Sequence, residues 1–132
     1  MHEVSSPYLE PVLAEDFEAM LVIRIEALRE SLERLGRFDP TRARARFEEG
    51  FTPEYMQHLT VEGERAGFIT LRPYEDEAGP SLKLDHLYLR LKFQNQGLGA
   101  WAMAWAQARA SARGLDIVLW ALKDSAANRF YL

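Results

Sequence analysis

The sequence predicts one domain of mixed α/β (α+β) architecture, and three observations carry this prediction. An amphipathic helical pattern runs through residues 14–36, and two alternating apolar runs at 55–61 and 65–72 form a hairpin pattern. Residues 82–122 have the pattern of a strand, a helix and a second strand. At 132 residues the chain is long enough for one hydrophobic core. It contains no internal repeat or linker, so we expect a single domain over residues 1–132.

The first half begins with YLEPVL at residues 8–13, a short apolar run that a proline interrupts, which is typical of an edge strand. In the helical stretch that follows, apolar residues recur every three or four positions, which predicts one buried face made of Phe17, Leu21, Ile25, Leu28, Leu32 and Leu35. Asp39 followed by Pro40 predicts the start of a second helix, because aspartate caps a first turn and proline fits the first helical position. After the hairpin, the acidic stretch PYEDEAGP predicts a loop.

The second half continues with SLKLDHLYL, a strand pattern, and then with a helix over residues 98–113. The spacing places five residues on one face of this helix: Leu98, Trp101, Trp105, Ala108 and Ala112. Residues 116–122 are apolar on both alternating faces, which favours a strand covered on both sides. A last helix is expected from residue 125, so the predicted order is β-α-α-β-β-β-α-β-α, with a right-handed crossover between the last two strands.

Composition excludes several classes of protein. The net charge of −4 argues against nucleic acid as the main partner, because phosphate-backbone binding needs a basic excess. There is no cysteine, which excludes disulfides and thiolate metal ligands, and the three scattered histidines give no metal-site pattern. We see neither a membrane-spanning run nor a signal-peptide pattern, and we expect a cytoplasmic protein without a membrane partner.

The junction QNQGLGA at residues 94–100 lies between the predicted strand and helix of the second half. Glycines there could simply make a tight turn, or they could let an anion approach the free main-chain amides of the helix start. A Walker loop needs a lysine and a hydroxyl residue after its last glycine, whereas Ala100 and Trp101 follow here. A dinucleotide fingerprint needs a third glycine, which is absent.

A different pattern fits the junction. Leu89, Gln94, Gly97 and Gly99 follow the series aliphatic, four residues, Gln or Arg, two residues, Gly, one residue, Gly or Ala. This resembles the acetyl-CoA-binding motif of the GNAT N-acetyltransferase superfamily. The stretch DSAANRFY is similar to the family's last-helix motif, with Asp124, Ala127, Phe130 and Tyr131 in register. Aspartate stands at position 124 where relatives often have asparagine, which puts a side-chain contact to the cofactor there in doubt.

The resemblance implies a mixed, mostly antiparallel sheet flanked by helices, with a splayed central pair of parallel strands. It implies acetyl-CoA as the acetyl donor, with no metal. Relatives continue with further strands after the tyrosine, so the chain ending at Leu132 implies either a trimmed product or a sheet edge completed by a partner chain. Homodimers are the commonest assembly for such proteins, so a homodimer is a possible assembly here.

The resemblance also assigns the donor contacts. Main-chain amides of the junction would hold the pyrophosphate, a set made of Gln94, Asn95, Gln96, Gly97, Leu98, Gly99 and Ala100. The end of the preceding strand would pair with the pantetheine arm through Leu87, Tyr88 and Leu89, and an N–H near Leu89 would polarise the thioester carbonyl. Asp124 and Asn128 would add contacts from the last helix.

Acetyl transfer to a primary amine needs a base and an acid. Tyr131 matches the family's thiolate-facing tyrosine, so the resemblance implies that it is the general acid. Asp85 and His86 are both candidates for the base. Strict alternation places Lys83, Asp85, Leu87 and Leu89 on one strand face and His86 and Tyr88 on the other, which favours Asp85, whereas a bulge would exchange the faces.

Histidine has the better intrinsic pKa for a base near neutral pH, and a water chain without a dedicated base is a further possibility. The partners expected for such an enzyme are acetyl-CoA and an amine acceptor, either a small molecule or a peptide. Two alternatives stay open. One is a non-catalytic module that binds or senses acyl-CoA, and the other is an oligomerisation scaffold with a vestigial pocket.

Overall fold

The computed structural model describes residues 6–36 and 38–119. Besides short 3-10 turns, these residues form α-helices and strands in this order: β1 (Tyr8–Pro11), α1 (Phe17–Arg34), α2 (Pro40–Glu49), β2 (Met56–Val61), β3 (Glu64–Asp76), β4 (Gly79–Leu89), α3 (Leu98–Ala112) and β5 (Ile117–Leu119). The strands of this part form one sheet in the order β1-β2-β3-β4-β5, in which β4 and β5 are parallel and the other neighbours antiparallel. The predicted mixed fold is confirmed, and the last predicted helix lies outside the described residues.

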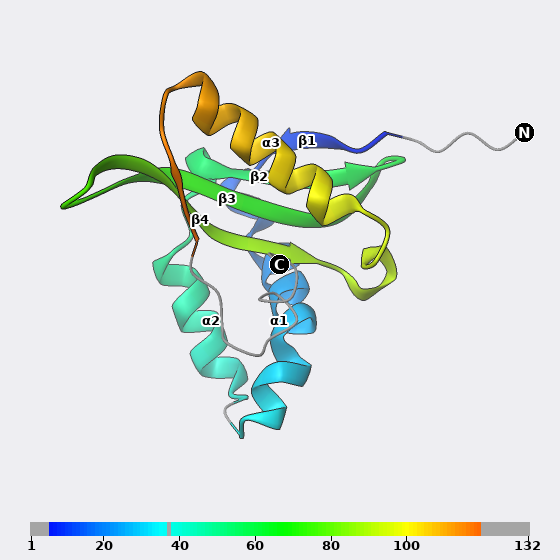
Figure 1. Ribbon diagram of the computed structural model, residues 1–132. Coiled ribbons are helices and arrows are strands. Elements are labelled where there is room, and N and C mark those ends of the chain that lie inside the picture. The colour runs from blue at the N-terminus through cyan, green and yellow to red at the C-terminus, as the bar shows by residue number, and fades with distance from the viewer. Residues whose placement is uncertain (1–5, 37, 120–132) are drawn as a thin grey trace, which may run out of the picture.

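Helices cover the two faces of the sheet unequally (Figure 1). Helix α3 lies on one face, where leucines of β3 and β4 pack against its alanines in the larger hydrophobic cluster. Helices α1 and α2 lie on the opposite face (Figure 1), where a second cluster contains Met20, Leu21, Phe47 and Phe68. The sheet therefore separates two apolar layers that are built from different residue types.

The start of α2 matches the prediction, because Asp39 Oδ1 accepts hydrogen bonds from the N–H groups of Thr41 and Arg42 at 3.0 and 3.3 Å. The predicted buried face of α1 is only partly correct. Leu21 and Leu28 are buried, whereas Leu35 is 50% exposed. The reason is local, since α1 ends at Arg34 and Leu35 lies beyond the last turn.

The predicted loop PYEDEAGP is wrong, because β3 continues through Asp76 and β4 already begins at Gly79. Only Glu77 and Ala78 turn the chain, and Asp76 Oδ1 accepts a hydrogen bond from the Ala78 N–H at 2.9 Å. Polar and proline residues are accepted here because this end of the hairpin projects beyond the helices, as its position in Figure 1 shows.

A bulge in β4 overturns the alternation expected from the sequence. Thr70 of β3 pairs with His86, and the next residue, Leu71, pairs with Leu84, so Asp85 has no partner of its own. As a result Leu84 and Leu87 both belong to the cluster beneath α3. The prediction that Leu87 and Leu89 share a face with Lys83 is wrong, because the extra residue shifts the phase of the strand.

Helix α3 packs through small residues rather than through its tryptophans. Its buried positions are Leu98, Gly99, Ala102, Ala106 and Ala110, while Trp101 and Trp105 are only partly buried at the edge of the cluster. Predicted face residues Ala108 and Ala112 are exposed. Small side chains let the helix axis approach the sheet closely, which pushes the large rings to the flanks. In β5, Leu119 is 39% exposed, so the described part of this strand is less covered than predicted.

Candidate functional site

The junction between β4 and α3 presents an uncapped helix start. A single 3-10 turn (Leu91–Phe93) follows β4, and α3 begins after Gly97. The first bond of the helix runs from the Trp101 N–H to the Gly97 carbonyl at 3.0 Å. The N–H groups of Leu98, Gly99 and Ala100 therefore come before the first hydrogen bond of the helix. Within the described part of the chain no side chain caps this helix start.

The backbone of this junction explains its glycine. Gly97 has a φ of 81°, a left-handed conformation that favours glycine, and a Cβ there would have no neighbour within 4 Å. Asn95 is also left-handed, with a φ of 63°. The two glutamines stabilise the turn from within: Gln94 Nε2 donates to the Leu89 carbonyl at 3.0 Å, and Gln96 Nε2 donates to the Lys92 carbonyl at 2.9 Å. The side-chain amides of both glutamines thus stabilise the loop that precedes α3.

The predicted pantetheine strand lies directly before this junction. Leu87, Tyr88 and Leu89 are paired with β3 along one side, and the register runs from Leu87 opposite Ile69 to Leu89 opposite Gly67. On the other side, the described pairing with β5 joins Leu82–Leu84 to Ile117–Leu119. The expected splay of the two parallel strands involves residues after Leu119 and lies outside the described residues, so it stays a prediction.

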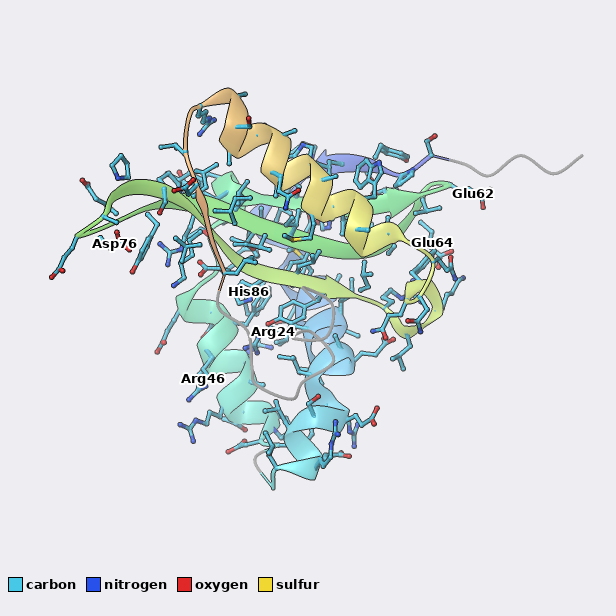
Figure 2. The ribbon with its side chains drawn as sticks, in the orientation of Figure 1. Arg24, Arg46, Glu62, Glu64, Asp76 and His86 are labelled. Carbon is cyan, nitrogen blue, oxygen red and sulfur yellow. The ribbon has the colours of Figure 1, made fainter. Side chains whose placement is uncertain are left out.

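His86 and Tyr88 project on the face covered by α1 and α2. The Tyr88 hydroxyl lies 3.2 Å from His86 Nδ1. Arg24 of α1 completes the group, with its guanidinium carbon 6.0 Å from the centre of the Tyr88 ring and 5.9 Å from that of Phe47. Arg24 and His86 lie between the sheet and the two helices in Figure 2. Three polar side chains thus meet inside an aromatic environment.

The electrostatics of this group follow from burial and from one charge. Burial first, and the positive charge of Arg24 second, lower the pKa of His86 to about 4, so its imidazole is neutral at neutral pH. Burial raises the pKa of Tyr88, and Arg24 opposes that rise. A neutral imidazole can accept a proton, although a pKa this low makes it a weak base.

Asp85, the other candidate base, is engaged in ion pairs. It contacts the Arg72 guanidinium, and its Oδ1 lies 3.4 Å from Lys83 Nζ. The bulge places it beside these two cations rather than on the face of Leu89. The argument from strand parity that favoured Asp85 over His86 therefore fails, and both residues remain candidates.

The structure brings together part of the predicted site. Leu87–Leu89 end β4, and the junction residues follow after the 3-10 turn at Leu91–Phe93. Asp85 and His86 lie in the same strand as Leu87–Leu89. Tyr131, Asp124 and Asn128 lie outside the described residues. The sequence analysis missed Arg24, for which one signal existed: it is a lone cation inside the apolar stretch MLVIRIEAL.

Two features are absent from the described residues. In this part of the chain no three His, Asp or Glu side chains gather as a metal site would require. Among the same residues, no helix is both long enough and apolar enough to cross a membrane.

Comparison with known proteins places this geometry in a family. The model of the acetyltransferase (GNAT) family matches residues 18–132. No curated protein matches the chain in sequence. Among solved structures, a PaiA N-acetyltransferase from Thermoplasma acidophilum in complex with coenzyme A is similar with a TM-score of 0.71 and 14% identity, over 96% of this chain and 86% of that chain.

Two further structures have the same fold. One is a GCN5-related N-acetyltransferase from Ralstonia eutropha JMP134, with a TM-score of 0.69 and 18% identity over 96% of this chain and 89% of that chain. The other is a ribosomal-protein-alanine N-acetyltransferase from Brucella melitensis biovar Abortus 2308, with a TM-score of 0.65 and 17% identity over 96% of this chain and 88% of that chain. From the extent of the family match, the chain belongs to the acetyltransferase (GNAT) family.

Proposed function

We propose that the protein transfers the acetyl group of acetyl-CoA to a primary amine of a small molecule or peptide. The observation that carries this proposal is the uncapped start of α3 at the end of β4, where Gly97 turns the chain. Free amides at a helix start carry partial positive charge and suit a diphosphate without the help of a metal. Family membership supports the same donor.

In this proposal the donor lies along the end of β4 and the following junction. N–H groups from Gln94 to Ala100 hold the pyrophosphate, and main-chain groups of Leu87–Leu89 pair with the pantetheine arm. A main-chain N–H near Leu89 polarises the thioester carbonyl as negative charge develops on its oxygen. Asp124 and Asn128 contribute contacts from the end of the chain.

The chemistry requires two proton movements. The acceptor ammonium loses a proton, its nitrogen lone pair attacks the thioester carbon, and the C–S bond breaks as the new C–N bond is established. Tyr131 protonates the departing thiolate. His86 is the better placed of the two base candidates, because its imidazole is neutral, whereas Asp85 is engaged by Arg72 and Lys83. Because its pKa is about 4, His86 does not stay protonated near neutral pH, and in this proposal it passes the proton of the acceptor on to water.

The test is a screen of amine acceptors with acetyl-CoA that reads the release of free thiol. We expect turnover with at least one amine and, in Tyr131→Phe, a loss of turnover of about 10²-fold or more, the range of general acid catalysis. Binding of CoA, measured by calorimetry, should survive that substitution. Failure of the wild-type protein to bind CoA at all would refute the proposal.

A second candidate is a module that binds acyl-CoA without transferring its acyl group. One observation favours it: neither base candidate combines a free side chain with a pKa near neutrality, since His86 titrates at about 4 and Asp85 is paired. The same screen separates the two functions. CoA binding without thiol release from small amines, peptides or polyamines would support the binding module.

A further inference from the structure

Arg24 is a cation in an apolar environment that the proposed acetyl transfer does not use. It is partly buried on the inner side of α1, with its guanidinium near the rings of Phe47 and Tyr88. One terminal nitrogen donates to the Ala43 carbonyl at 3.2 Å. Its Nε is buried and has no hydrogen-bond partner, and within the described part of the chain no carboxylate pairs with it.

A guanidinium held in this way costs free energy unless a further hydrogen-bonding partner binds it. A charge taken out of water loses hydration, and aromatic faces, the Ala43 carbonyl and the Tyr88 hydroxyl replace only part of it. A second polar group in the same place is also unmatched. Thr70 is fully buried, lies opposite His86 in the sheet register, and its hydroxyl has no partner. Two buried polar atoms without hydrogen-bond partners, Arg24 Nε and Thr70 Oγ1, therefore lie on the same side of the sheet as the candidate base His86.

The position of Arg24 relative to β4 indicates which substrate it meets. Tyr88 contributes its main chain to the strand proposed for pantetheine, while its side chain points to Arg24 on the face of α1 and α2. Tyr88 therefore connects Arg24 to the strand at which the thioester is proposed to bind. It lies on the side from which His86 projects, as Figure 2 shows.

We propose that Arg24 binds a carboxylate of the acceptor, so that the acceptor is an amino acid or another amine that carries a carboxylate. This inference rests on the proposed function. A guanidinium matches a carboxylate in a fork of parallel hydrogen bonds, which a neutral amide of the same shape does not reproduce. The bound carboxylate then fixes the position of the amine relative to the thioester.

The same contact connects substrate binding to the base. The charge of Arg24 contributes, after burial, to the low pKa of His86. A carboxylate bound to Arg24 offsets that charge, so the pKa of His86 rises when this acceptor binds. The imidazole becomes a stronger base in the complex with a carboxylate-bearing amine than in the free protein.

The experiment compares each of several amino acids with its carboxamide and its decarboxylated amine. We expect kcat/KM for the acid to exceed that for the carboxamide by about 10- to 100-fold, as a charged hydrogen bond requires. In Arg24→Gln the ratio of kcat/KM for the acid to kcat/KM for the carboxamide should fall to about one. Arg24→Lys, which keeps the charge, should retain part of the preference.

The matched control is Arg29→Gln, which removes the same charge from an exposed position of the same helix, where Arg29 pairs with Glu33. It should leave the acid preference intact. A wild-type protein that acetylates acid and carboxamide equally well overturns the role of Arg24 and leaves acetyl transfer standing. A loss of CoA affinity of tenfold or more in Arg24→Gln also overturns it, because Arg24 would then serve the donor.

A binding measurement keeps the two proposals distinguishable. In NMR titrations the amino acid should raise the His86 midpoint in the wild-type protein and not in Arg24→Gln. That result without any acetylation would support the carboxylate site and refute acetyl transfer. The opposite result is acetylation of amino acids in which neither the His86 midpoint nor the preference for the acid depends on Arg24. That result would support acetyl transfer and refute the carboxylate site.

Discussion

Gly67 near the start of β3 is the position where one added methyl group should do the most damage. A Cβ built there would lie 1.9 Å from the Tyr88 carbonyl oxygen and 3.0 Å from Leu89 Cα. The first distance is about 1.5 Å shorter than ordinary van der Waals contact, and the neighbour is main chain, which cannot rotate away. Gly67→Ala must therefore separate β3 from the end of β4.

The magnitude follows from the bonds that this separation breaks. The Arg90 N–H donates to the Ala66 carbonyl at 2.8 Å beside the contact, and Gly67 is paired with Leu89. Losing one or two buried main-chain hydrogen bonds and repacking the strand costs about 3 kcal/mol. For a domain of this size, about 3 kcal/mol lowers the Tm by roughly 10 °C.

The assay is thermal unfolding followed by circular dichroism, with urea unfolding to obtain the free energy. Gly50→Ala is the control, because a Cβ at Gly50 would lie 3.7 Å from His86 Nε2, an ordinary contact, and its φ of −97° suits any residue. We expect Gly50→Ala to change the Tm by less than about 2 °C. A Gly67→Ala protein whose Tm lies within about 2 °C of the wild-type Tm would refute the argument that β3 must separate from β4.

Three further predictions concern the junction, Asp16 and His86. Gly97→Ala should cost about 1 kcal/mol from its left-handed backbone alone and weaken CoA binding, measured by urea unfolding and calorimetry. The hydrogen bond from His58 lowers the pKa of Asp16, so the ionised carboxylate stabilises the fold above its ordinary pKa of 3.8 and loses that effect as pH falls through the lowered value. Asp16→Asn should thus be less stable than the wild type at pH 7, by about 1 kcal/mol, with the difference shrinking below pH 4 in urea unfolding curves. NMR should place the His86 titration near pH 4, and stability should fall as pH drops from 6.5 towards 4, because the unfolded chain takes that proton first.

Local signals in the sequence were sufficient for much of the fold. Asp39 and Pro40 mark a helix start that depends only on neighbouring residues, and the structure has the cap that they predict. The turn at Glu62 and Gly63, where both residues have positive φ, is equally local. The motif at Gly97 predicted the helix start that lies at the centre of the proposed donor site. These features require no knowledge of the rest of the chain.

Features that depend on distant partners could not be predicted in the same way. Helix α3 buries Ala102 and Ala106 because the sheet approaches closely, and the sequence offers no measure of that distance. Tryptophans at 101 and 105 gave the stronger hydrophobic signal and lie at the margin. Arg24 looked like one charge in an apolar run, and its contacts with Ala43 and Tyr88 depend on how α1 crosses α2 and β4.

The bulge at Asp85 lets one strand serve two different environments. Upstream of it, Leu84 faces α3, and in strict alternation His86 and Tyr88 would face the same way, into a layer of leucines and alanines. An imidazole and a phenol there would meet no polar partner from α3, which is costly in an apolar layer. One extra residue turns both side chains towards Arg24 and returns Leu87 and Leu89 to α3. The core therefore keeps its apolar packing while the last third of β4 can present polar side chains on one face and main-chain groups at the edge where the donor is proposed to lie.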